Sequence, residues 1–244
     1  MIGKKKKEYV FRFKQFTINH IKSAMKVGFD GILLGAWMDV SDDKYILDIG
    51  SGSGLLALMA AQKNSEAIIY AIEPHLPSYL EAIQNIKHSP WSDRIKGINK
   101  KIQSYYSNSN LKFDHLICNP PYFDEFSVPD NESQKISKHK FMLSSEELID
   151  NSARLLKPSG KLSLILPFAD KKNFIELASE RQFTLLKLVN VISKKSVVKR
   201  ILMEFVFKST LKITTEESGI EIYKQDGSYS SKYIDLVKDF YLKY

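Results

Sequence analysis

The chain has 244 residues, 43% of them hydrophobic, and carries a formal net charge of +8. It is long enough to bury a sizeable core, and we expect one α/β domain with an appendage. No apolar run approaches the roughly 18 residues that a membrane helix needs, and no apolar segment follows the N-terminal lysines, which argues against membrane and secreted classes.

Cysteine and histidine content argues against disulfides and metal sites. The single cysteine, Cys118, can form no intramolecular disulfide, and the five histidines show no ligand spacing. We therefore expect a cytoplasmic, monomeric protein with no metal and no membrane partner.

The positive charge is concentrated in two short stretches. Residues 1–26 contain eight lysines and arginines against Glu8 alone, and residues 193–200 contain four with no acidic residue. Clustered positive charge binds a polyanion through phosphate contacts and counterion release. The alternative is a solvated lysine tail that only aids solubility. The predicted RNA-binding residues are Lys4, Lys5, Lys6, Lys7, Arg12, Lys14, Lys194, Lys195, Lys199 and Arg200.

The chain begins with a basic N-terminal arm, residues 1–24. Within it, residues 9–16 alternate apolar and basic side chains, which predicts a short strand or an arm across the domain. Its phenylalanines either pack on the core or stack on nucleic acid. Residues 25–37 indicate a glycine-containing loop that enters an apolar helix ending near Met38.

Strands and helices then alternate up to residue 208. The predicted strands are 45–50, 67–73, 95–102, 113–118, 161–166, 183–192 and 200–207, and the predicted helices are 53–63, 76–88, 144–157 and 170–181. This alternation predicts an α/β, Rossmann-like, seven-stranded and mostly parallel sheet with helices on both faces. Its last two strands form an antiparallel hairpin. Residues 25–208 are taken as one domain.

Two segments lie outside this alternation. Residues 123–142 have no regular pattern and are long for a loop, which indicates a substrate-facing flap. Residues 209–244 are expected to form an appendage with a peripheral hairpin and a closing amphipathic helix near 230–242. No chemistry is assigned to it.

A glycine-rich loop, residues 48–54, follows the first of these strands. Its glycines stand at positions 50, 52 and 54, and Leu55 occupies the place of the third glycine in a dinucleotide fingerprint. The spacing therefore favours a cofactor without a pyrophosphate. Asp48 suits an ammonium group, and Glu73, which ends the next strand, suits the hydroxyls of a ribose.

The sequence Asn119-Pro120-Pro121-Tyr122 ends the strand at 113–118. The prolines fix the local backbone, so that the Asn119 amide and the Pro120 carbonyl can accept both hydrogens of a planar amino group. Tyr122 offers a face on which a base can stack. The alternative is a simple strand-ending turn, but together with the glycine loop the motif predicts chemistry on an exocyclic amine.

These motifs resemble those of the class I S-adenosylmethionine-dependent methyltransferases that methylate amino groups. Three blocks, Met25–Trp37, Leu47–Leu58 and Cys118–Phe123, are similar to the bacterial enzymes that methylate N6 of adenine 37 in valine tRNA. The resemblance implies S-adenosyl-L-methionine as cofactor and tRNA as partner. The implied catalytic residues are Asn119, Pro120, Pro121 and Tyr122; the implied cofactor-binding residues are Asp48, Gly50, Gly52, Gly54, Glu73 and Asn119, with Lys26, Asp30, Ile102 and Gln103 as weaker candidates.

Two positions depart from the family pattern. Phe29 stands where a threonine is usual, and Lys101 stands where many relatives place an acid for the cofactor's adenine. Backbone groups or Gln103 would have to substitute, and weaker cofactor binding is expected.

Three alternatives remain. The first keeps the chemistry with another acceptor, namely rRNA, a DNA adenine or a release-factor glutamine, although the helical N-terminal domain of the glutamine enzymes is absent. The second is a non-catalytic RNA-binding protein on the same scaffold. The third, an NAD-linked oxidoreductase, is disfavoured by the glycine spacing.

Overall fold

The computed structural model describes residues 9–23, 26–105, 111–120, 143–193 and 197–243. Several predicted features lie outside these ranges: Lys4 to Lys7, Pro121, Tyr122, Lys194, Lys195 and the flap at 123–142.

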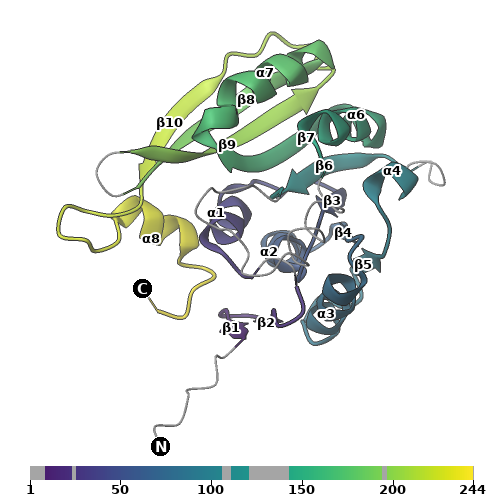
Figure 1. The fold of residues 1–244 in the computed structure, drawn as a ribbon, viewed down its shortest axis with the longest axis vertical. Helices are drawn as coiled ribbons and strands as arrows, with labels where there is room; N and C mark the ends of the chain where they lie inside the picture. Colours follow the sequence, from purple (N-terminus) through teal and green to yellow (C-terminus); the bar gives the residue numbers. More distant parts are fainter. Residues whose placement is uncertain (1–8, 24–25, 106–110, 121–142, 194–196, 244) are drawn as a thin grey trace, which may run out of the picture.

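One large sheet organises the described chain (Figure 1). Its strands follow the order β10-β8-β9-β7-β6-β3-β4-β5. Their bounds are β3 Tyr45–Ile49, β4 Ile68–Ile72, β5 Ile95–Ile98, β6 Phe113–Cys118, β7 Leu156–Pro167, β8 Phe183–Ile192, β9 Val198–Phe207 and β10 Glu216–Glu221. Pairing is parallel except where β9 lies between β7 and β8. The predicted fold class is confirmed, with the antiparallel β8–β9 hairpin.

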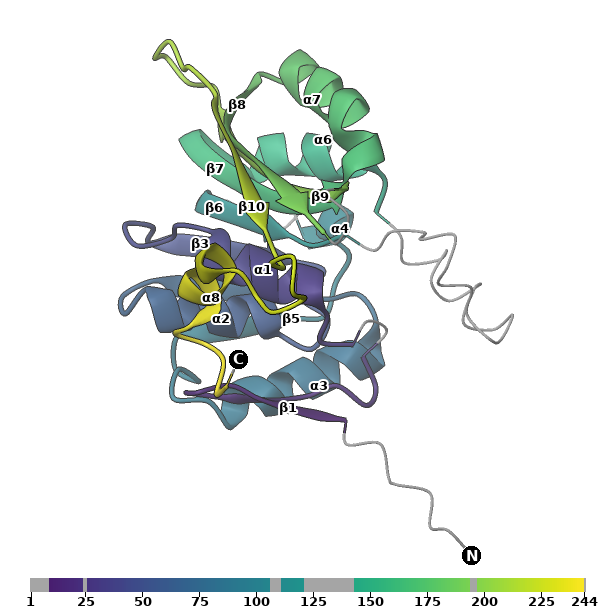
Figure 2. The ribbon, with the colours of Figure 1, turned by 90° about the vertical axis from the view of Figure 1, so that its left-hand side faces the viewer.

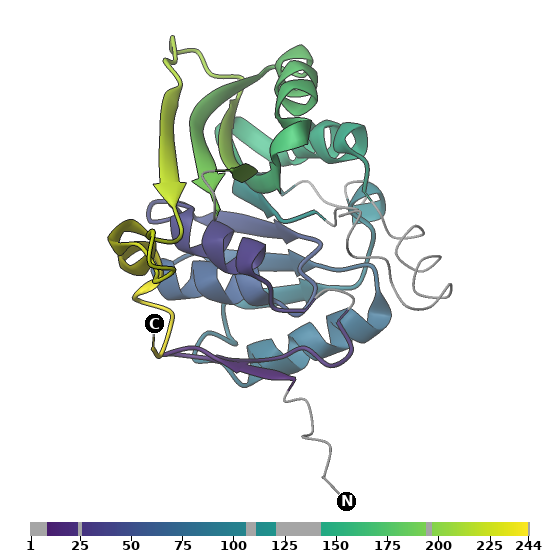
Figure 3. The same ribbon diagram turned by 60° about the vertical axis from the view of Figure 1, so that its left-hand side comes forward.

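The sheet has eight strands and not the predicted seven. The additional strand, β10, pairs in parallel with β8 at the edge, where a peripheral hairpin was predicted. Only Ile220 is buried in it, so it lacks the apolar alternation by which a strand is recognised. Figure 3 shows β10 as the outermost strand.

Helices cover both faces of the sheet because its central strands bury side chains on both sides. Ile46 and Leu47, neighbours in β3, belong to opposite halves of the core. On one side pack α1 Phe29–Trp37, α2 Leu55–Lys63, α3 Leu76–Lys87 and α8 Ser231–Val237; on the other pack α4 Ile102–Tyr105, α6 Ser145–Leu155 and α7 Lys171–Glu180, with a 3-10 turn, η2 Phe168–Asp170, before α7.

The largest differences between predicted and observed element boundaries are at three places. The strand expected to reach residue 102 ends at Ile98, and α4 starts at Ile102. β7 begins at Leu156, before the predicted strand at 161–166. Its pairing with β6 is irregular in this added stretch, where Ser159 has a left-handed conformation. The closing helix spans Ser231–Val237.

The N-terminal arm forms a separate antiparallel pair, β1 Val10–Arg12 and β2 Thr17–Asn19. Figure 2 shows this pair running beside α3. Phe13 and Phe16 are buried, and their rings stack with centroids 4.5 Å apart. These two phenylalanines therefore pack on the core, which was one of the two alternatives.

Strand direction brings the functional candidates to one edge. The carboxyl ends of the parallel strands β3, β4, β6 and β7 face the same way. Because β9 runs in the opposite direction, it begins at that edge, and Arg200 pairs with Pro167 at the end of β7. In open α/β sheets ligands bind beyond these carboxyl ends.

A row of buried, hydrogen-bonded polar side chains crosses the sheet on the side of the amino ends of its parallel strands. His115 Nδ1 lies 2.8 Å from Asp43 Oδ2, and His115 Nε2 lies 2.8 Å from the Ser163 hydroxyl. Ser163 in turn donates to Glu204 at 3.1 Å. Buried polar groups are tolerated when they are paired in this way.

We expect Asp43→Ala to destabilise the fold by about 1–3 kcal/mol, because it leaves Nδ1 of the buried His115 without its hydrogen-bond partner. Urea denaturation measures the free energy of unfolding. Asp42→Ala is the matched control, since this neighbouring acid is exposed. A loss from Asp43→Ala no larger than that from Asp42→Ala would contradict the expectation.

Candidate active site

The glycine-rich loop needs three glycines because of its backbone conformation. Gly50, Gly52 and Gly54 have φ angles of 69°, 55° and 86°, a region that other residues rarely adopt. The amides of Gly50 and Ser51 both donate to the Ile72 carbonyl, at 2.9 and 3.0 Å. The loop is thus tied to the end of β4 before it enters α2.

Asp48 lies under this loop and is fully buried. Its Oδ2 accepts from the Ala57 amide in the first turn of α2 at 3.1 Å, whereas its Oδ1 has no hydrogen-bond partner among the described residues. Burial raises the pKa of Asp48 to about 7, opposed by the Ala57 hydrogen bond and reinforced by the Glu73 carboxylate. An ammonium group nearby would favour its ionised form.

Glu73 holds two parts of the site together. Its Oε2 accepts from the Gly52 amide and its Oε1 from the His75 amide, both at 2.8 Å. Burial raises the pKa of Glu73, and these two hydrogen bonds oppose the shift. Each carboxylate oxygen has a second lone pair, so it can also accept from a ribose hydroxyl.

Asn119 and Pro120 follow β6 beside the glycine loop. β3 and β6 are neighbours, with Ile49 opposite Cys118, so Gly50 and Asn119 leave adjacent strands at the same level. A methyl group added at Gly31, in α1, would lie 3.6 Å from Asn119 Nδ2 and 3.0 Å from a Leu55 methyl. The start of α1 at Gly31 therefore lies close to both the Asn119 side chain and Leu55 at the start of α2.

Similarity to known proteins identifies the family to which this chain belongs. A family model described as methyltransferase small domain matches residues 21–190. A tRNA1(Val) (adenine(37)-N6)-methyltransferase from Trichodesmium erythraeum is 40% identical over 96% of this chain and 98% of its own length. A Shewanella baltica protein of the same name is 38% identical, over 96% and 99%. The chain belongs to this methyltransferase family.

A solved structure supports the fold of this methyltransferase. A predicted O-methyltransferase from Agrobacterium tumefaciens matches with a TM-score of 0.67 over 86% of this chain and 96% of that chain, at 19% identity. That likeness concerns the fold alone.

S-adenosylmethionine is the methyl donor of class I methyltransferases, and the residues of this chain fit it. The observations are the buried and unpartnered Asp48 Oδ1, the left-handed glycine loop and the inward-held Glu73 carboxylate. The individual contacts of Asp48, Gly50, Gly52, Gly54, Glu73 and Asn119 stay predictions.

The weaker cofactor candidates have partners within the methyltransferase. Lys26 Nζ donates to the carbonyls of His20 and Ile21, at 2.6 and 2.9 Å. Gln103 donates to Glu147 at 3.0 Å, Asp30 accepts from Arg200 at 2.8 Å, and Ile102 is buried. These contacts favour a structural role for them.

The two departures from the family pattern lie at the first residue of α1 and directly before α4. Phe29 stacks on Tyr233 of α8, with ring centroids 5.6 Å apart. Lys101 is exposed. Asn99, which sequence reasoning missed, donates to the Glu73 and Pro74 carbonyls at 2.8 and 3.3 Å. A lone asparagine after a strand gives no signal for such a role.

The predicted RNA-binding residues within the described ranges differ in their contacts. Arg12 and Lys199 are exposed. Lys14 donates to the Lys238 carbonyl at 2.6 Å, and Arg200 pairs with Asp30 at the start of α1. Arg200 is therefore partly engaged within the protein, although it lies at the carboxyl edge.

The described part of the chain holds no cluster of three or more histidine, cysteine, aspartate or glutamate side chains suited to a metal. Nor does any described helix have the length and apolar character to span a bilayer.

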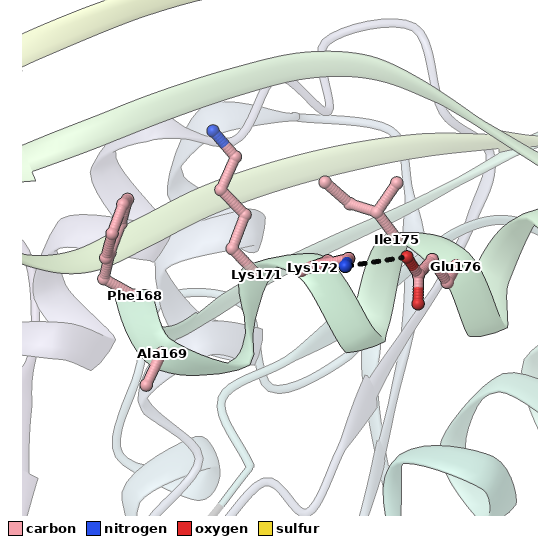
Figure 4. Close-up of a pocket in the computed structure, with 6 residues that line it drawn as sticks. All are labelled: Phe168, Ala169, Lys171, Lys172, Ile175 and Glu176. Carbon is pink, nitrogen blue, oxygen red and sulfur yellow. Dashed lines mark ion pairs between the residues drawn. The ribbon is translucent and has the colours of Figure 1, made fainter.

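A cavity of about 480 Å³ opens beside α7, away from the glycine loop (Figure 4). It is lined by Phe168, Ala169, Lys171, Lys172, Ile175 and Glu176. Lys172 and Glu176 pair across one turn of the helix, at 3.8 Å. None of the predicted site residues lines it.

Proposed function

We propose that this methyltransferase transfers a methyl group to N6 of adenine 37 in the anticodon loop of valine tRNA. The observation that carries the proposal is the near-full-length similarity to proteins of that name, in a chain that keeps Asn119 and Pro120 beside the glycine loop. The proposed setting is the cytoplasm, where tRNA is found, and the proposed form is a monomer.

The residues that follow β6, Asn119 to Tyr122, are called the hook here, and their proposed role is to overcome the poor nucleophilicity of the target amine. The lone pair of the adenine amino nitrogen is delocalised into the ring, which makes the nitrogen a poor nucleophile. The Asn119 side-chain oxygen and the Pro120 carbonyl would accept its two hydrogens and direct the lone pair outward, while Tyr122 stacks on the base. S-adenosylmethionine, when bound, supplies an electrophilic methyl group on a sulfonium. Orientation of this kind is worth roughly 7–11 kcal/mol.

An anticodon-loop base suits this site energetically. A base must leave its stack before its amino group can reach Asn119. Unstacking costs a few kcal/mol and is easiest in a single-stranded loop.

The acceptor is tested by methyl transfer from labelled S-adenosylmethionine to a panel of substrates. The panel contains unmodified valine tRNA, the same tRNA with adenine 37 replaced, a release factor, rRNA and DNA. Label on the unmodified tRNA alone is expected. Label on another member would keep the chemistry and replace the acceptor, and no label at all would favour the non-catalytic alternative.

Replacing Lys4 to Lys7 with alanine is expected to weaken tRNA binding and to flatten its salt dependence. The slope of log affinity against log salt falls by about 0.7–0.9 for every lysine–phosphate pair that the substitutions remove. Filter binding at several salt concentrations measures the slope. Substitution of Lys44 and Lys112, exposed residues at the opposite edge of the sheet, serves as the control. A slope unaltered by the N-terminal substitutions would reject the arm as an RNA contact.

A further inference from the structure

One face of α3 buries polar side chains, which is unusual for a helix on a sheet. Ser78, Glu81 and Asn85 are 1%, 7% and 2% exposed. Their spacing of three and four residues places them on the same side of the helix. Burying a polar group costs free energy unless the group is hydrogen-bonded. The hydrogen-bond partners of these side chains therefore indicate their role.

Glu81 binds the N-terminal segment just after β2. Its Oε1 accepts from the Lys22 amide at 2.9 Å, and its Oε2 accepts from the Ser23 amide at 2.7 Å and from the Ser23 hydroxyl. Successive backbone amides form a concave site for an anion, and here the carboxylate fills it. Glu81 therefore fixes residues 22–23 on α3.

Asn85 joins the same segment to the glycine-rich loop. Its Oδ1 accepts from the Asn19 amide at 2.9 Å, and its Nδ2 donates to the carbonyls of Asn19 and Ser53, both at 2.8 Å. Ser53 lies between Gly52 and Gly54. One side chain thus connects the end of β2 to the loop that the cofactor requires.

The chain that follows β2 leads to α1, and α1 lies close to Asn119 of the hook. The Val27 amide donates to His20 Nδ1 at 2.8 Å. This hydrogen bond joins the residue after β2 to the residue before the N-cap of α1. Gly28 is the N-cap of α1, and Gly31 in that helix lies against Asn119. The described residues after β2 are thus held to the glycine loop at one end and lead to the hook at the other.

We propose that Glu81 and Asn85 are positioning residues for S-adenosylmethionine. They hold the N-terminal segment and the glycine loop in one arrangement, so that the cofactor-binding edge is formed before the cofactor arrives. Preorganisation of this kind improves affinity because less ordering accompanies binding. The inference rests on the proposed function for the use of the cofactor but not for the choice of acceptor.

The test compares Asn85→Ala with Asn64→Ala in the full-length protein. Asn64 is also buried, and its Nδ2 donates to the Val40 and Asp43 carbonyls at 2.6 and 2.8 Å, at the amino ends of the strands. Both variants lose buried hydrogen bonds and some stability. Asn85→Ala alone is expected to raise the Kd and the KM for S-adenosylmethionine at least about tenfold, with kcat at saturating cofactor little changed.

Calorimetric titration with S-adenosylmethionine, below the melting onset of each variant, measures the Kd without any RNA. A Kd for Asn85→Ala equal to that of the wild type, or an equal rise in Asn64→Ala, would overturn the proposal.

If Asn85→Ala does not fold, Glu81→Gln decides, because it keeps the shape and one acceptor oxygen. It is expected to raise the Kd, and an unchanged value would reject the proposal. If the wild-type protein binds the cofactor but leaves valine tRNA unmodified, the result instead contradicts the proposal that valine tRNA is the acceptor.

Discussion

Asn119→Ala is expected to lower the rate of methyl transfer by about 10²–10³-fold, while the Kd for S-adenosylmethionine stays within a few-fold of the wild type. The side chain acts on the amine in the transition state, where its charge redistribution is largest, and the loss therefore appears in kcat. Single-turnover transfer to valine tRNA and calorimetric titration with cofactor measure the two quantities separately.

The matched variant is Asn119→Asp, which keeps an acceptor oxygen at the same position. It is expected to retain more activity than Asn119→Ala, since acceptance of an amine hydrogen is the proposed role. Normal turnover in Asn119→Ala, or equal losses in both variants, would contradict that role.

Asp48→Asn is expected to raise the Kd for S-adenosylmethionine by about 10–100-fold, the range for removal of a hydrogen bond to a charged group. The substitution is nearly isosteric, and an amide oxygen can still accept from Ala57, which Asp48 does at 3.1 Å. The weaker binding would therefore report the charge of Asp48. Asp48→Ala, which also removes the hydrogen bond to α2, should lose both cofactor binding and transfer.

The same residue predicts a pH dependence. Burial raises the pKa of Asp48 to about 7, so below this pH the carboxyl group of the unbound protein is increasingly protonated. A cationic ammonium favours the ionised form, and binding must then release a proton. Affinity is expected to fall as pH drops from 7 to 5.5 in the wild type and to stay level in D48N. Parallel pH profiles for the two proteins would contradict this account of Asp48.

The centre of the sheet and the glycine loop were predictable because their signals are local. A short apolar run followed by glycines at 50, 52 and 54 determines both a strand end and a left-handed backbone. The run from Phe113 to Cys118, with Pro120 and Pro121 shortly after it, predicts a strand and its end just as clearly. Parallel strands place their carboxyl ends at one edge, so the alternation of strands and helices accounts for both blocks lying at that edge. That β3 and β6 are direct neighbours is known from the structure.

The missed features depend on tertiary contacts. β10 is largely exposed and becomes a strand only because the edge of β8 offers it backbone partners. The pairing of Arg200 with Asp30, 170 positions away, has no sequence signal either, and the RNA-binding role of Arg200 stays a prediction. Asn85 gives no pattern at all, since a polar residue on a helix is ordinarily solvated and only the fold brings it to Ser53.

The most direct test of the proposed function is the location of the methyl group in valine tRNA after reaction with the purified protein. Nuclease digestion followed by mass spectrometry of the fragments gives both the nucleotide and its position. The account predicts N6-methyladenosine at position 37 with the wild type, and its formation about 10²–10³-fold more slowly with Asn119→Ala. A methyl group at another nucleotide, or the same product from Asn119→Ala at the wild-type rate, would contradict it.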